Sequence, residues 1–249
     1  MDRTINKFYI LCVAAFVVSG QVYALFSDRV LVVGAISPTS AYIFDAMPDA
    51  QITMRAADLP RLFLQPQNPL VWMLLFVLWG LLVLDIFTQI NATRTPAYDR
   101  EAIPLYIALL AGAICPWLFE ISIALAALCA LLMVTAAIAA ARRVVNDRRT
   151  AVYFFAGWST ALGVVAAVGL IGGQLNLSII QAAILVLIVG MIVGIFTQFQ
   201  LKNRISYSIA VIWVFCGLAL ATTSASLLVA LIAILAISGM AITMIFAAS

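Results

Sequence analysis

Residues Leu70–Ile90, LVWMLLFVLWGLLVLDIFTQI, decide the class of the fold. In this stretch Asp85 is the one charged side chain, and it lies near the C-terminal end. A helix of about 20 mostly apolar residues is long enough to cross the hydrocarbon core of a bilayer. The run is too long for an ordinary strand and too apolar for a surface helix of a soluble protein. It therefore predicts a transmembrane helix.

Similar apolar runs extend in both directions from this one, and the sequence predicts an all-α polytopic bundle of about eight spans. The Ile103–Phe119 run is short, carries Pro104 and Pro116, and is expected to form a tight helical hairpin with the next span. We expect residues 1–249 to form a single membrane domain. The expected spans are Phe8–Phe26, Leu70–Ile90, Ile103–Phe119, Ile121–Ala141, Thr150–Ile171, Ser178–Thr197, Ile205–Thr222 and Ser226–Phe246.

The composition agrees with a membrane protein, because 66% of the residues are hydrophobic and only 9% are charged. A soluble domain is nearer half apolar and a quarter charged. This excludes a soluble enzyme, a nucleic-acid binder and a disordered linker. The chain has no histidine, which excludes His-ligated haem and imidazole-dependent catalysis. The four cysteines lie in apolar runs without a C-x-x-C pair, and we interpret them as packing residues.

The distribution of basic residues predicts the orientation in the membrane. With the N-terminus inside, ten of the 13 Lys and Arg residues fall in inner segments and three fall in outer segments. Cytoplasmic loops are enriched in Lys and Arg. We therefore expect both termini in the cytoplasm and a location in a bacterial inner membrane. The three outer basic residues are Arg29, Arg55 and Arg61.

All three belong to a loop of about 40 residues, 27–69, which is the one sizeable extramembrane segment between the predicted spans. Five prolines interrupt it, so we expect one or two short helices at the outer interface, either as a cap on the bundle or as a lid over a cavity. The first span leaves an alternative open, because Val22-Tyr23-Ala24 resembles a signal-peptidase site. We expect a retained helix, because the run is long for the apolar region of a signal peptide. Cleavage would leave seven spans with the N-terminus outside.

Asp85 is the clearest candidate for chemistry inside the membrane, because charged residues within spans are costly and often functional. It lies less than about 8 Å from the inner end of its helix. Two interpretations stay open: a structural role, hydrogen-bonded or paired with a loop arginine, and a ligand-contact or proton-linked role. Glu120, at an outer helix turn, is interpreted as solvent-accessible. No pattern for a catalytic site, a metal site or a mid-membrane lysine occurs.

The tryptophans are the second candidate feature. Trp79 and Trp213 are deep in their spans, away from the interfaces where tryptophan usually gathers, and Trp158 lies in Gly157-Trp158-Ser159-Thr160. Buried indoles present a large flat face and an N–H group that needs an acceptor. They either line a cavity for a flat apolar ligand or fill space between helices.

Three of these motifs resemble the larger multi-helix relatives of the TspO/MBR group, the tryptophan-rich sensory proteins. They are Trp79-Gly80, the Gly157-Trp158-Ser159-Thr160 step after a basic loop, and Trp213 followed by Gly217. The resemblance extends from about Leu70 to Leu220, over roughly two-thirds of the chain. It implies a helical membrane protein that binds a porphyrin or other tetrapyrrole, or a sterol, without a histidine ligand. The W-x-P-x-W loop of the compact five-helix members is not found in this sequence.

Three functions therefore stay open. The first is a TspO-like binding or sensory protein, with Trp79, Trp158, Trp213 and Asp85 as its ligand-binding residues. The second is a non-catalytic accessory subunit, whose small-residue faces would dock on a second copy or on a larger membrane complex. The third is a small-molecule transporter, supported by Asp85 and by polar residues interpreted as mid-span, such as Gln181 and Thr160. The bilayer is the expected partner in all three, and nucleic acid in none.

Overall fold

The computed structural model of the protein describes residues 2–26, 59–66, 68–91, 98–144, 149–202, 204–222 and 227–248, and these ranges form nine α-helices. The expected all-α bundle is confirmed. In chain order the helices are α1 (Asp2–Phe26), α4 (Leu59–Leu64), α5 (Pro69–Asn91), α6 (Tyr98–Ile121), α7 (Ile123–Arg143), α8 (Thr150–Gln174), α9 (Ile179–Leu201), α10 (Ile205–Thr222) and α11 (Leu227–Ala248).

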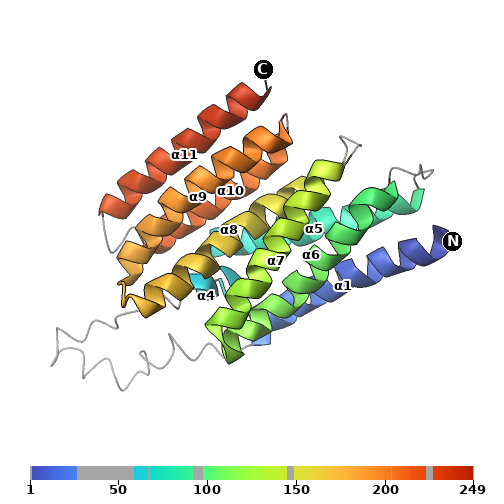
Figure 1. The fold of residues 1–249 in the computed structure, drawn as a ribbon, viewed down its shortest axis with the longest axis horizontal. Helices are drawn as coiled ribbons and strands as arrows, with labels where there is room; N and C mark the ends of the chain where they lie inside the picture. The colour runs from blue at the N-terminus through green and yellow to red at the C-terminus, as the bar shows by residue number, and fades with distance from the viewer. Residues whose placement is uncertain are drawn as a thin grey trace.

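Each of the eight expected spans corresponds to one of these helices. Seven of the described helices are long and apolar enough to cross a membrane, and the apolar part of α10, Ile205–Leu220, is shorter. Figure 1 shows the beginning of α1 and the end of α11 at the same end of the bundle. This arrangement requires an even number of passes between them, so α10 also runs from one end of the bundle to the other.

Helices α6 and α7 form the expected hairpin, joined through Ser122 alone. The prediction that the first of them is short is wrong. Helix α6 has 24 residues and continues through both Pro104 and Pro116. It begins at Tyr98, in a polar stretch before the apolar run, which a hydropathy pattern does not count as part of a span.

Helix α8 is the centre of the bundle, with α7 on one side and α9, α10 and α11 on the other (Figure 1). Nearly all of its residues from Ala151 to Val168 are buried. Gly157 makes this possible, because a Cβ atom there would lie 2.5 Å from the carbonyl oxygen of Tyr207 on α10. Small residues allow helix backbones in a membrane to approach closely, and at Gly157 only hydrogen fits.

Gly190 and Gly194 pack against other helices of the same chain. A Cβ atom at Gly190 would meet the ring of Phe215 on α10, and one at Gly194 would meet Met240 on α11. This G-x-x-x-G step therefore packs α9 against its own neighbours.

The interpretation of Gln181 as a mid-span polar residue is wrong, since it is the third residue of α9 and belongs to the capping box that begins the helix.

The outer loop contributes α4, one of the short helices that were expected there. Its residues Leu59, Phe63 and Leu64 are buried, and it packs mainly against α8. Residues 27–58 and 67 lie outside the described residues, as do the expectations that fall on them. Helix α4 lies at the end of the bundle opposite the two chain ends (Figure 1).

Candidate functional site

The candidate site is organised around one face of α1. Tyr9, Phe16, Gly20 and Tyr23 follow one another at spacings of seven, four and three residues, which place them on one side of a helix. The three aromatic side chains are buried, whereas Leu11, two residues after Tyr9, is exposed. This face meets α5, α6 and α8, and its two tyrosines are about 21 Å apart along the helix.

At the inner end of this face, Tyr9, Asp85 and Arg149 form a buried polar cluster, which we call the inner triad. The Tyr9 hydroxyl donates to Oδ2 of Asp85 at 2.6 Å, and Nη2 of Arg149 donates to the same oxygen at 2.6 Å. Nε of Arg149 donates to Oδ1 at 3.3 Å, so the guanidinium holds both carboxylate oxygens. The side chains of Arg149 and Asp85 are only 6% and 3% exposed.

In the inner triad Asp85 is paired with a loop arginine, Arg149. This is the pairing expected if Asp85 has a structural role. Arg149 directly precedes α8, so the pair joins α5 to α8, while Tyr9 adds α1. The guanidinium also lies over the Tyr9 ring, 5.6 Å from its centroid. An isolated charge at this burial is strongly disfavoured, and a forked arginine–carboxylate pair neutralises it. The ligand-contact role of Asp85 stays a prediction.

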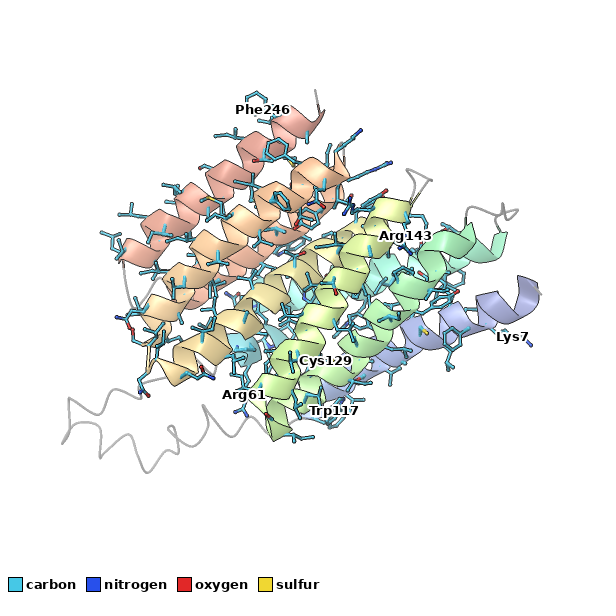
Figure 2. The ribbon with its side chains drawn as sticks, viewed as in Figure 1. Lys7, Arg61, Trp117, Cys129, Arg143 and Phe246 are labelled. Carbon is cyan, nitrogen blue, oxygen red and sulfur yellow. The ribbon has the colours of Figure 1, made fainter. Side chains whose placement is uncertain are left out.

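A second cluster of the same kind, the outer triad, lies at the other end of the α1 face. The Tyr23 hydroxyl donates to Oε1 of Glu120 at 2.7 Å, and Nη2 of Arg61 donates to Oε2 at 3.2 Å. The Arg61 and Glu120 side chains are 30% and 44% exposed. Glu120 is accessible, as expected, but it also ties α6 to α1 and to α4. Figure 2 shows Arg61 at the end opposite Lys7 and Arg143.

Two of the three predicted ligand-binding tryptophans pack against the α1 face between the triads. The ring of Trp158, on α8, lies 5.7 Å from that of Phe16, edge to face, and is stacked on Phe155. The indole of Trp79, on α5, lies against Gly20, where a Cβ atom would come within 3.3 Å of it. One turn of α1 separates Phe16 from Gly20, so the two indoles flank neighbouring turns of one helix.

The third tryptophan, Trp213, belongs to a different neighbourhood. Its indole N–H donates to the carbonyl oxygen of Leu70 at 3.1 Å, and its ring meets Phe154 edge to face. Among the described residues, no ring contact joins Trp213 to Trp79 or Trp158. Their assignment as ligand-binding residues stays a prediction for all three.

The remaining tryptophans lie toward the outer end, as interface anchors do. Trp117 donates its N–H to the Ser19 hydroxyl at 2.9 Å and contacts the Tyr23 ring, and Trp72 stacks on Phe76.

The four cysteines are free thiols, and those of α6 and α7 donate to backbone carbonyls of the opposite helix. No group of three or more potential metal ligands occurs in the part of the chain that the structure describes.

Sequence reasoning missed Tyr9, Tyr23 and the partners of both carboxylates. A signal for the tyrosines was available, because Tyr9, Phe16 and Tyr23 repeat at intervals of seven residues within an apolar helix. Nothing in the sequence distinguishes Arg149 from the other inner arginines.

No protein-family model, no curated protein and no solved structure matches the chain.

Proposed function

We propose that this multi-pass helical membrane protein binds a flat hydrophobic ligand of the porphyrin or sterol class, as the tryptophan-rich sensory proteins that it resembles do. The binding region would be the α1 face between the two triads. The ligand would be held by stacking and apolar contact, because the chain offers no histidine to ligate it.

The observation that supports this proposal best is the convergence of Trp79 and Trp158 on one face of α1. Offset-stacked and edge-to-face aromatic contacts give such a region a preference for flat rings. Phe16 and Phe155 extend the aromatic surface beside Trp158. Among the described parts of the bundle, this region combines two of the predicted tryptophans with a polar cluster at its inner end.

The inner triad would orient the ligand, because it places polar side chains at one end of the binding region. Asp85 follows Trp79 by six residues on α5, a rise of about 9 Å along the helix axis. A ligand with a flat apolar body and one polar edge would lie with its body against the indoles. Its polar edge would face Asp85, Arg149 and Tyr9, which is the arrangement expected for a tetrapyrrole carboxylate or a sterol hydroxyl.

Titration of the purified protein with protoporphyrin, followed by tryptophan quenching and porphyrin absorbance, tests the proposal. A ring contact contributes about 0.5–1.5 kcal/mol, so Trp79→Phe and Trp158→Phe should each weaken binding by up to about tenfold. Trp117→Phe is the matched control, because that ring lies at the outer end and is 42% exposed. Trp213→Phe decides whether the third predicted tryptophan contributes. Unsaturable quenching, or equal affinities in all variants, would reject the site.

An accessory subunit of a larger membrane complex is the second candidate. It is favoured by Trp213, whose N–H is already bonded to Leu70 and whose ring packs on Phe154, so this indole needs no ligand to satisfy it. In this case the tryptophans fill interhelical space, and porphyrin titration gives no saturable site. Gentle extraction followed by native mass spectrometry would then recover a complex heavier than one chain.

We also infer that the end of the bundle carrying both termini faces the cytoplasm of a bacterial inner membrane. Lys7 and Arg143 lie at that end in Figure 2, and Arg61 lies at the other. The described basic residues Arg142, Lys202 and Arg204 also belong to helix ends or turns on the side of the termini. Basic residues gather on the cytoplasmic side of membrane proteins.

A further inference from the structure

A group of polar side chains lies between α8, α9 and α10, away from both triads. Each member is at most 4% exposed, and polar side chains are costly to bury inside a membrane bundle. The group consists of Ser159 and Thr160 on α8, Thr197 and Gln198 on α9, and Tyr207 and Ser208 on α10. Polar groups buried at this depth need hydrogen-bond partners.

Most of the group has partners within the chain. Ser159 and Thr160 donate to the carbonyl oxygen of Ala156 at 2.9 and 2.7 Å. Ser208 donates to Oε1 of Gln198 at 2.7 Å. The Gln198 amide donates in turn to the Lys202 carbonyl oxygen at 2.8 Å, in the turn between α9 and α10. The bonds of Ser208 and Gln198 form a polar connection from that turn into the bundle.

Tyr207 is the exception. Its hydroxyl oxygen is fully buried and makes no hydrogen bond of acceptable geometry to any described residue. The hydroxyls of Thr160 on α8 and Thr197 on α9 lie close to it. The backbone of Tyr207 is held in place by its close approach to Gly157.

We propose that the hydroxyls of Tyr207, Thr160 and Thr197 bind one buried water molecule. A buried water makes two to four hydrogen bonds to groups that otherwise lack them. Tyr207 would donate to the water, and the water would donate to Thr160, whose own proton is already directed at Ala156. Three neutral hydroxyls supply no charge for a metal cation, which prefers carboxylate and carbonyl oxygens.

Water would reach this site along the same polar connection. Thr197 is four residues before the end of α9 at Leu201, a rise of about 6 Å. Gln198 and Ser208 lie between it and the α9–α10 turn, where Lys202 is exposed. The site is separate from the aromatic region on α1 and does not depend on the ligand proposed there.

Radiolytic footprinting of the intact protein in detergent micelles tests the proposal, because X-ray pulses produce hydroxyl radicals from bound as well as bulk water. The expected result is oxidation of Tyr207 despite its burial. Phe155 is the control: it is equally buried, and its ring packs on Phe16 and Trp158. In a Thr160→Val, Thr197→Val variant, which keeps the side-chain shapes, the Tyr207 signal should be lost. No labelling of Tyr207, or labelling that persists in the double variant, overturns the proposal.

Tyr207→Phe gives a second measurement that does not depend on the double variant folding. If the hydroxyl is bonded to water, its removal lowers the Tm, because a hydrogen bond is lost and the water keeps fewer partners. If the hydroxyl is buried without a partner, its removal relieves a desolvation penalty and does not lower the Tm. A Tm equal to or above that of the wild type overturns the proposal.

Discussion

Removal of the guanidinium of Arg149 is expected to destabilise the protein far more than removal of the guanidinium of Arg61. Both arginines pair with a carboxylate that also accepts a tyrosine hydroxyl, so the two triads form a matched pair within one molecule. They differ in burial: the inner pair is 6% and 3% exposed, and the outer pair 30% and 44%. Methionine keeps most of the apolar stem of arginine, so Arg149→Met and Arg61→Met mainly remove the charge.

The magnitude follows from that difference in burial. Breaking a buried ion pair by removing one partner costs about 3–5 kcal/mol, because the other charge is left unpaired. An exposed pair is worth about 0–1 kcal/mol. Arg149→Met is therefore expected to lower the free energy of unfolding by several kcal/mol and Arg61→Met by less than about 1 kcal/mol. Asp85→Asn, combined with Arg149→Met, should restore part of the loss, since no unpaired charge remains.

Equilibrium unfolding in mixed detergent micelles, followed by tryptophan fluorescence, measures these differences. The four proteins to compare are the wild type, the two single arginine variants and the double variant. Equal losses for Arg149→Met and Arg61→Met would show that water or detergent headgroups reach the inner triad. A double variant less stable than Arg149→Met would show that Asp85 is stabilised by something other than this arginine. Either result would refute the reasoning from burial.

Three further results are expected. Gly157→Ala should cost about 1–3 kcal/mol by overpacking α8 against α10, whereas Gly80→Ala, where a Cβ atom meets nothing within 4 Å, should be neutral or stabilising in the same unfolding assay. In a cysteine-free background, cysteines at Lys202 and Leu227 should be labelled by impermeant maleimide from opposite sides of the membrane, and labelling from one side would mean that α10 does not cross. Ser178→Ala removes the capping box of α9 and should lower stability by about 0.5–2 kcal/mol, and a smaller loss would mean that water replaces the cap.

The sequence by itself determined the class and the approximate positions of the helices. Within a bilayer every backbone N–H and C=O must be bonded inside the segment, so an apolar run of sufficient length has little choice but to form a helix. This is a local property, and it places all eight expected spans to within a few residues of helices in the structure. The beginnings of α1 and α6 differ most, by six and five residues, because these helices start at Asp2 and Tyr98. The first residues of both are mostly polar and become helical as extensions of the apolar runs that begin at Phe8 and Ile103.

The candidate site was determined by sequence only in part. Asp85 is evident because a charge inside an apolar run is rare, and Trp79 and Trp158 because they lie away from the usual interfaces. The grouping of those two indoles, and the separate neighbourhood of Trp213, depend on which helices pack together. Hydropathy carries no information on that choice, since lipid and neighbouring helices are almost equally apolar surroundings for a side chain.

Tertiary structure alone decided the partners of the charged groups. Tyr9 and Arg149 are 76 and 64 positions away from Asp85 in the chain, and several inner arginines were equally plausible partners. The pairing is set by the packing of α1, α5 and α8, which brings three distant segments within hydrogen-bond distance at one end of the bundle. A buried charge must be neutralised where the fold places it, and only the relative positions of the helices decide which residue is close enough to do so.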